Sequence, residues 1–289
     1  MKEIIAINNN DLARAHEIID NCDSVLIGAG TGLSASAGFL MNDFATFKRL
    51  FPGYTRRYGL RTVAEAVSFY FPSVEEHYAF LARYISVFRY STPLEDVYTN
   101  LLDMVKNKPH FVITTTTNGQ FVNAGFEKQS IYSPHGDLSF FQCSMPCSKK
   151  LVQNRKMVEK MLDDLTENPF AIRSSNIPTC PRCGSFFEPN IRETTNFNNN
   201  PWVLKSADYI DFLKNAVKGN LVLLELGVGS DSTSVIRYPF EYIAANYKNS
   251  ILIRINLNDY RTEVPFADKK TLAYNIDIKE FCDSLAQAV

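Results

Sequence analysis

The sequence has no excess of charge of either sign: 30 Lys and Arg face 31 Asp and Glu, which gives a net charge of -1. This balance excludes a strongly basic nucleic-acid binder driven by counterion release, and it excludes an acidic disordered protein. No apolar run approaches the about 20 residues that a membrane-spanning helix needs. The first residues, MKEIIAINNNDLARAHE, turn polar within seven positions and do not resemble a secretory signal. We therefore expect a cytoplasmic protein.

Size and composition are those of an ordinary folded protein. The 289 residues are 45% hydrophobic and 21% charged, close to the usual globular balance. This length corresponds to two domains of about 150 residues each, or to one domain with a large insertion. A chain of this size buries most of its surface on folding and needs no disulfide bonds to do so.

The hydrophobic pattern predicts alternating strands and helices. We expect buried strands at 24–30, 110–118, 130–136, 221–229 and 251–258, and helices at 10–21, 74–90, 94–108, 208–220, 238–249 and 278–289. Asn10 or Asp11 is expected to cap the first helix, and Ser73 and Glu76 form a capping-box pair before the second. No strand signal occurs between 45 and 108. This alternation favours a mostly parallel α/β sheet.

A glycine-rich segment follows the first predicted strand. Gly30, Gly32 and Ala35 match the G-x-G-x-x-A fingerprint, in which glycine lets the backbone approach a pyrophosphate at a helix N-terminus. A tight strand-to-helix turn without a ligand has the same pattern, so both interpretations stay open. Dinucleotide dehydrogenases also have an acidic residue at the end of a second strand about 20 positions on. Here that region, MNDFATFKRLFPGY, carries no strand signal, which disfavours an ordinary dehydrogenase.

Four of the six cysteines form two close pairs. Three residues separate Cys143 from Cys147, two separate Cys180 from Cys183, and 32 residues lie between the pairs. Thiolates at this spacing predict a tetrahedral zinc site. An iron site would have similar ligands, whereas two disulfides are disfavoured in a reducing compartment. Four thiolates leave no open coordination position, so we expect the metal to be structural.

Several motifs, in order, resemble those of the sirtuin family. GTGLSASAG at 30–38 resembles the sirtuin GAGIS loop, TTNGQ at 116–120 the TQNID motif, and PHG at 134–136 the segment with the sirtuin histidine. The four-cysteine module with IPTCPRCG at 177–184 comes next, and LGVGS at 226–230 resembles the GTS segment. INL at 255–257 and NID at 275–277 resemble the segments beside the ribose and adenine of NAD. The resemblance spans roughly residues 24–281.

The resemblance implies an α/β fold with a Rossmann-like parallel sheet and helices on both faces. It also implies a small domain made of a zinc-binding module and a helical insertion. We expect the NAD-binding domain to consist of residues 1–44, 94–138 and 203–289. The helical insertion at 45–93 and the four-cysteine module at 139–202 then form the small domain.

The resemblance also assigns expected site residues. Asn118 would hold the ribose or position the nucleophile, and His135 would accept a proton, unless it is a structural histidine. We expect cofactor binding at Ala29, Gly30, Gly32, Ser34, Asp43, Phe44, Asn118, Gln120, His135, Gly227, Gly229, Ser230, Asn256 and Asp277. The expected metal ligands are Cys143, Cys147, Cys180 and Cys183.

Three departures from the sirtuin pattern bear on the reaction. The PDFR segment is missing, and Asp43 and Phe44 partly replace it. Gln120 stands in place of the TQNID aspartate, so the position keeps its hydrogen bonding and loses its charge. Arg192 replaces an apolar residue that would cover an acyl chain, and burying an unpaired guanidinium there is costly. Arg192 either recognises an acceptor protein or a carboxylate, or is a solvated loop arginine.

These departures resemble the macrodomain-linked, class M sirtuins of microbes, which implies an NAD-dependent protein mono-ADP-ribosyltransferase with structural zinc. The resemblance implies a protein acceptor, with a lipoyl carrier of the glycine-cleavage H type as the candidate. It also implies a macrodomain protein that reverses the modification; no nucleic-acid or membrane partner is expected. The alternatives are an NAD-dependent lysine deacylase and a non-catalytic regulatory module that binds NAD or ADP-ribose.

Overall fold

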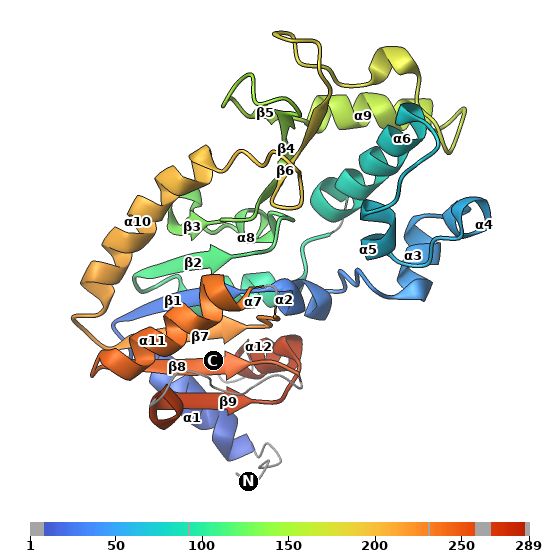
Figure 1. The fold of residues 1–289 in the computed structure, drawn as a ribbon. Helices are drawn as coiled ribbons and strands as arrows, with labels where there is room; N and C mark the ends of the chain where they lie inside the picture. The colour runs from blue at the N-terminus through green and yellow to red at the C-terminus, as the bar shows by residue number, and fades with distance from the viewer. Residues whose placement is uncertain (1–8, 92, 231, 258–266, 287–289) are drawn as a thin grey trace.

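A six-stranded sheet forms the larger part of the protein (Figure 1). The computed structural model describes residues 9–91, 93–230, 232–257 and 267–286. The strand order is β3-β2-β1-β7-β8-β9, and every neighbouring pair is parallel. The strands are β1 (Ser24–Ala29), β2 (His110–Thr114), β3 (Ile131–Tyr132), β7 (Leu221–Leu226), β8 (Ser250–Ile255) and β9 (Thr271–Tyr274). The predicted parallel α/β sheet is confirmed.

Helices cover both faces of this sheet. The side chains of a strand point alternately to opposite faces, and both faces of these strands carry apolar side chains that must be buried. Val25 and Ile27 of β1 pack into one hydrophobic core, and Leu26 between them packs into the other. All six residues of β1 and of β7 are buried, as expected for a parallel sheet covered twice. One face carries α1 (Asn9–Asp20), α7 (Asp96–Val105) and α12 (Ile278–Ala286), and the other α10 (Asn200–Ala216) and α11 (Tyr238–Asn246).

The order of the strands reverses beside β1. From β1 the chain proceeds to β2 and β3 on one side, and it later returns to β7 on the other side. The connections that leave the carboxyl ends of β1 and β7 therefore run in opposite directions. Open α/β sheets bind their ligands in the crevice at this switch point. Both glycine-rich segments of the sequence start there, at Gly30 and Gly227.

A second, smaller set of elements forms what we call the small lobe. Its three-stranded antiparallel sheet has the order β5-β4-β6. Its elements are β4 (Gly136–Cys143), β5 (Val152–Gln153), β6 (Phe187–Ile191), α3 (Phe44–Leu50), α4 (Tyr54–Tyr58), α5 (Val63–Val67), α6 (Val74–Ile85) and α9 (Arg155–Asp164). Figure 1 places α6 beside α9 and the β4-β6 pair in this lobe.

Aromatic side chains hold the helices of the small lobe together. Tyr54 and Phe51 are fully buried, and their rings contact Phe80 of α6 at centroid distances of 6.1 and 5.4 Å. The oxygen of Ser73 accepts a hydrogen bond from the backbone N–H of Glu76 at 3.2 Å and caps α6, as predicted. Most of the aromatic-rich segment thus belongs to a core, although parts of it line a groove described below.

The remaining short elements are α2 (Thr31–Ser36), α8 (Gln120–Asn123), the 3-10 turns Lys128–Ser130, Ser174–Asn176 and Ala267–Lys270, and the π-helical turns Ser86–Ser91 and Thr233–Arg237. Several details differ from the sequence predictions. The third strand is shorter than predicted, because the chain turns at Ser133 before β4 begins at Gly136. Within the described residues the first helix spans Asn9–Asp20, so Asn10 and Asp11 lie inside it and not at the expected N-cap position. Strands β4, β5, β6 and β9 were not predicted. Strand β2 ends at Thr114 and not at residue 118, and α10 spans Asn200–Ala216 where a helix was predicted at 208–220.

The described part of the chain contains no helix that is both long enough and apolar enough to cross a bilayer. The domain boundaries expected from the sequence stay a prediction.

Candidate functional site

The two glycine loops are in direct backbone contact at the switch point. The Gly32 N–H donates to the carbonyl of Gly227 at 2.9 Å, and the Gly30 N–H donates to the Leu226 carbonyl at 3.0 Å. A Cβ atom on Gly32 would lie 2.6 Å from the Gly227 Cα, and one on Gly30 would lie 2.5 Å from the Gly227 oxygen. Gly227 itself has φ +58°, which favours glycine. These glycines are therefore required for the loops to meet, whether or not a phosphate lies beside them.

The residues around the second loop hold its backbone in place. The Asn256 side chain donates from Nδ2 to the Val228 carbonyl at 2.9 Å, so half of this amide is used within the protein. Gly229 is half-buried and Ser230 is exposed. The carbonyl of Ala29, at the end of β1, accepts bonds from Thr115 N and Thr114 Oγ1, both at 3.0 Å. The two loops thus present backbone and small polar groups at one edge of the sheet.

Asn118 lies in a buried polar network beside the first glycine loop. Its Nδ2 donates to Ser34 Oγ at 3.0 Å, and its Oδ1 accepts from the backbone N–H of Gln120 at 3.2 Å. The Ser34 hydroxyl lies 3.5 Å from the Tyr98 hydroxyl. Burial raises the pKa of Tyr98, so its hydroxyl stays protonated at neutral pH. This network fixes the Asn118 amide through both of its polar atoms.

Gln120 has a buried amide group without a partner. The side chain is fully buried, and neither Oε1 nor Nε2 has a hydrogen-bond partner among the described residues. An unsatisfied buried amide typically costs about 1–3 kcal/mol. It lies two residues after Asn118 and offers one acceptor and two donors. A bound group with complementary polar atoms would remove this cost.

His135 and Arg192 are paired. The two lie 2.7 Å apart, between Arg192 Nη1 and His135 Nε2, and the Arg192 backbone N–H donates to the His135 carbonyl at 3.0 Å. A guanidinium can only donate, so this geometry requires an unprotonated Nε2 and a neutral imidazole with its proton on Nδ1. The side chain of His135 is buried. Arg192 is exposed, and its guanidinium also contacts the candidate base directly.

The β4-β6 pairing brings His135 to the Asn118 segment. Gly136 of β4 pairs with Ile191 of β6, which places Arg192 beside His135. The Leu138 N–H donates to the Thr117 carbonyl at 3.0 Å, so β4 also contacts the residue before Asn118. The two catalytic candidates, 17 positions apart in the sequence, therefore flank one backbone contact.

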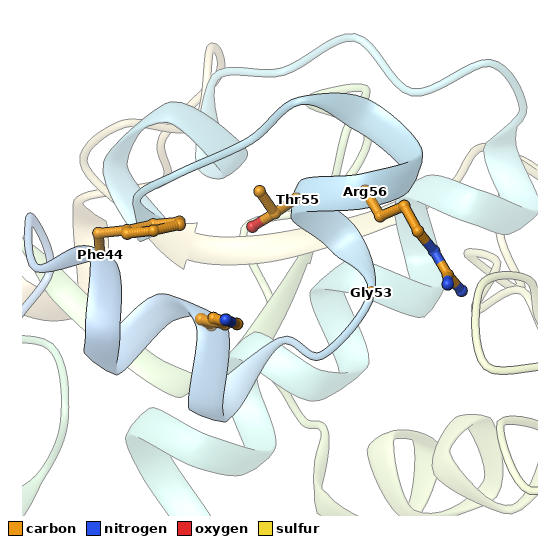
Figure 2. A pocket seen from close by; sticks show the side chains of 5 residues that line it. Phe44, Gly53, Thr55 and Arg56 are labelled. Carbon is orange, nitrogen blue, oxygen red and sulfur yellow. The ribbon is translucent and has the colours of Figure 1, made fainter.

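Asp43, Phe44 and Asp277 have structural contacts of their own. Asp43 caps α3, because its Oδ2 accepts from the Thr46 N–H at 2.6 Å, and this bond lowers the pKa of the carboxyl group. Figure 2 shows Phe44 at a surface pocket with Gly53, Thr55 and Arg56, which no other predicted site residue lines.

Asp277 contacts the end of the helix that follows the first glycine loop. Its Oδ1 accepts from the Ser36 hydroxyl at 2.7 Å and from the Lys279 N–H at 2.8 Å. This carboxylate therefore joins α2 to the start of α12. The contact supports the position of the first loop, and it engages one oxygen of the carboxylate that was expected to lie near the adenine.

The four paired cysteines form one cluster. The sulfur of Cys143 lies 3.4 Å from those of Cys147 and Cys183, and the sulfurs of Cys147 and Cys180 are 3.6 Å apart. All four sulfurs lie within 4.8 Å of one another. A disulfide would need a distance of about 2.05 Å, whereas tetrahedral zinc with bonds of about 2.3 Å places its sulfurs about 3.8 Å apart. The cluster fits a tetrahedral zinc ion.

Sequence reasoning missed a buried charge cluster beneath the second glycine loop. Arg254 donates to both oxygens of Glu225, at 2.8 and 2.7 Å, and to Glu241 at 2.8 Å. Arg237 lies 3.3 Å from Glu225 and donates to the Val228 carbonyl at 2.8 Å. A signal was present, because Glu225 and Arg254 are the single charged residues of two apolar strands.

Comparisons with known proteins support the resemblance to sirtuins. No family model matches the chain. A protein ADP-ribosyltransferase from Staphylococcus aureus is 26% identical over 84% of this chain and 77% of that relative. A probable bifunctional ADP-ribose hydrolase/ADP-ribosyltransferase from Fusarium oxysporum f. sp. cubense is 28% identical over 89% of this chain. The match covers 44% of that relative, so this chain spans less than half of its length.

Solved structures that resemble this chain include Sir2 proteins. A structure of Sir2 bound to an acetylated peptide aligns with a TM-score of 0.55 at 20% identity, over 96% of this chain and 98% of the other. A complex of Sir2 with a p53 peptide and NAD+ aligns with a TM-score of 0.52, also at 20% identity and over the same shares of both chains. These likenesses show the Sir2 fold, a Rossmann-like sheet with a smaller lobe, and confirm the predicted fold class.

Proposed function

We propose that this protein is an NAD-dependent protein mono-ADP-ribosyltransferase of the sirtuin type. In this reaction ADP-ribose moves from NAD to a protein acceptor, and nicotinamide is released. The observation that carries the proposal is the convergence at the switch point: two touching glycine loops, the fixed amide of Asn118 and the neutral His135 lie at one end of the sheet. Both named relatives carry ADP-ribosyltransferase in their names.

The glycine loops and Gln120 would hold NAD. Gly30, Gly32, Ser34, Gly229 and Ser230 would surround the pyrophosphate, since the carboxyl ends of β1 and β7 form the ligand crevice of such sheets. The buried, unsatisfied amide of Gln120 matches a carboxamide such as that of nicotinamide, which also has one acceptor and two donors.

Asn118 and His135 would act at the ribose. Loss of nicotinamide leaves positive charge on the sugar, so the site must hold the ribose and exclude water. Asn118 can do this because Ser34 and the Gln120 backbone fix its amide. His135 is neutral in this structure and can accept a proton from a ribose hydroxyl or from the acceptor. To use Nε2 for this step, His135 must release Arg192, which makes Arg192 a control on the base.

Two features of the small lobe disfavour the alternative, lysine deacylation. First, Arg192 places a cation where an acyl chain would need an apolar cover. Second, the outer edge of β6, where a substrate peptide would add as a strand, is already bonded within the protein. The Phe187 N–H donates to the Pro178 carbonyl, and the Phe187 carbonyl accepts from the Tyr78 hydroxyl at 2.7 Å. The Pro189 carbonyl accepts from the Thr194 hydroxyl at 2.6 Å.

Zinc would be bound by Cys143, Cys147, Cys180 and Cys183, with a structural role. Four thiolates occupy all four positions of a tetrahedral ion. The ion would stabilise the antiparallel β4-β6 pair, because Cys143 ends β4 and Cys180 and Cys183 precede β6. The β4-β6 register in turn positions Arg192 beside His135.

The acceptor we propose is a protein, with a lipoyl carrier of the glycine-cleavage H type as the first candidate. A macrodomain protein would reverse the modification. The Sir2 structures with bound peptides are consistent with a protein acceptor. The lipoyl carrier and the macrodomain partner rest on the resemblance of the sequence to macrodomain-linked sirtuins.

Incubation with radiolabelled NAD and a lipoylated carrier protein tests the proposal. Label on the carrier together with free nicotinamide supports transfer. O-acyl-ADP-ribose from an acylated peptide would instead support deacylation, and NAD binding without nicotinamide release would support a regulatory module. The variant Asn118→Ala should lose transfer. Asn123→Ala, an exposed amide on neighbouring α8, is the matched control and should retain it.

A further inference from the structure

The small lobe contains an aromatic groove that the proposed reaction does not use. Its volume is about 770 Å³, and it lies between the segment 67–84, which includes α6, and the segment 186–195, which includes β6. The volume is in the range of ordinary ligand pockets. Its aromatic lining comes from Phe69, Tyr70, Phe71, Tyr78, Phe80, Tyr84 and Phe186. Tyr70 is 96% exposed and Phe186 is 42% exposed, so the rim is open to solvent.

The charge of this groove is negative and is not balanced by the residues that line it. Glu188 and Glu193 line it, and no lysine or arginine does so among its described lining residues. Apart from the tyrosines, the third ionisable residue of the groove is His77. Burial lowers the pKa of its imidazole, which is therefore neutral at pH 7. Glu188 is half-buried, and burial raises the pKa of its carboxyl group.

Both carboxylates lie close to the aromatic walls. Burial raises the pKa of the Tyr78 and Tyr84 hydroxyls, and the negative charges of Glu188 and Glu193, respectively, add to the effect. Each acid therefore acts on a different wall residue of the same groove. A ligand that fits both features has an apolar body and a positive head.

Lysine and arginine side chains have this shape, an aliphatic stem with a cation at its end. Cations over aromatic rings are stabilised by the ring electrons. The small lobe already uses this interaction outside the groove, where the guanidinium of Arg57 lies 5.0 Å from the centre of the Phe170 ring and that of Arg61 lies 4.6 Å from the Phe44 ring. The groove offers the aromatic rings and carboxylates of such a contact, and the cation would come from a ligand.

The groove lies next to the candidate active site along β6. Ile191, the last residue of β6, lines the groove. The next residue, Arg192, contacts His135. We propose that this groove docks a basic side chain, lysine or arginine, of the protein acceptor and so presents a neighbouring acceptor residue to the site. This inference rests on the proposed transferase function and deepens it, because it gives the chemistry by which the acceptor is recognised.

Peptide binding tests the groove without any need for turnover. The probes are a fluorescein-labelled hexapeptide with two lysines and its counterpart with two glutamines, and the readout is fluorescence anisotropy. We expect the lysine peptide to bind the wild type and to bind Glu188→Gln/Glu193→Gln about tenfold more weakly, a loss in the range of cation–π and exposed ion-pair contributions. Glu159→Gln/Glu167→Gln changes the charge of the same lobe equally and should bind like the wild type.

Two results would overturn the inference: equal binding of both peptides by the wild type, or equal binding of the lysine peptide by the wild type and the groove variant. If the double variant unfolds at a lower temperature than its control, the single variant Glu193→Gln, at an exposed position, replaces it with an expected loss of about threefold.

Transfer assays separate this inference from the proposed function. With the acceptor protein as substrate, the groove variant should raise the KM for the acceptor, and 0.5 M salt should raise the KM of the wild type towards that of the variant, because salt screens the attraction. A wild type that binds the lysine peptide but labels no protein would refute the transferase and leave the groove assigned. Transfer with an acceptor KM that neither the variant nor salt changes would refute the groove alone.

Discussion

Replacement of Arg254 by methionine tests whether the buried charge cluster supports the second glycine loop. Arg254 is fully buried on β8, and its guanidinium lies between Glu225 and Glu241, which are also fully buried. Methionine keeps much of the volume of the side chain and removes three charge-assisted hydrogen bonds of 2.7 to 2.8 Å. The two carboxylates stay in the core without the cation between them.

The expected cost follows from desolvation. Breaking a buried ion pair by removing one partner typically costs about 3–5 kcal/mol, because the remaining charge has lost its hydration. A folded protein is stable by only about 5–15 kcal/mol, so the variant should unfold at a much lower urea concentration. The loop should respond as well. Glu225 also bonds Arg237, which donates to the Val228 carbonyl beside Gly227, so we expect a higher KM for NAD.

Urea denaturation followed by circular dichroism measures the loss, and nicotinamide release at varied NAD measures the KM. Arg155→Met is the control, because Arg155 is 66% exposed and its ion pair with Glu159 lies at the surface; it should cost less than about 1 kcal/mol. Arg254→Met/Glu241→Gln should regain part of the stability, because it also removes the charge of a buried carboxylate that Arg254 neutralises, while Glu225 keeps its contact with Arg237. A cost for Arg254→Met no larger than that of the control would refute the reasoning.

Four further predictions follow from other contacts. Gly32→Ala should lower the melting temperature and abolish NAD cleavage, since the new Cβ would lie 2.6 Å from the Gly227 Cα; unchanged turnover would contradict the loop contact. Gln120→Leu should leave the melting temperature equal or higher, because it removes unsatisfied buried atoms, while NAD turnover falls; full turnover would exclude a role for this amide in binding. Cys183→Ser or a strong chelator should unfold the small lobe and release about one zinc per chain, which a metal analysis of the dialysate checks. Burial would raise the pKa of Asp164, but hydrogen bonds from a backbone N–H and a side-chain amide lower it. The ionised Asp164 therefore stabilises the fold above the pKa of the unfolded state, and this contribution is lost as the pH falls through the lower pKa of the folded state. The melting temperature of Asp164→Asn should therefore decline less steeply below about pH 4 than that of the wild type.

Local patterns allowed much of the fold to be predicted. The strands β1, β7 and β8 are mainly apolar runs that are followed by glycine or asparagine. Their sequences alone therefore identify them as strands, whatever they pair with. Strand β9 was missed because Thr271–Tyr274 is short and only partly buried, and it becomes a strand by pairing with β8 at the edge of the sheet. The third strand was predicted too long, since nothing in the sequence indicates the turn at Ser133.

The candidate site was predictable only where it is local in sequence. Each cysteine pair is close enough in the chain to form a metal-binding turn, so the cluster could be predicted before any fold was known. The contact of Gly32 with Gly227 joins residues 195 positions apart, and that of His135 with Arg192 joins residues 57 positions apart. Both depend on strand order and register. The expected position of Asp43 in the site was drawn from a motif that matches only partly, and the structure shows this residue as a helix cap.

The parallel sheet and the small lobe contribute different groups to the candidate site. The glycine loops, Asn118 and the buried cluster all belong to the ends of the parallel strands or to the loops that follow them. Arg192 and the aromatic groove belong to the small lobe, which is joined to the parallel sheet by the short segment between β3 and β4 that contains His135. The β4-β6 register therefore determines which group faces His135, whereas the parallel sheet determines where NAD can bind. A change on β6 should therefore alter the use of the acceptor and leave the affinity for NAD intact.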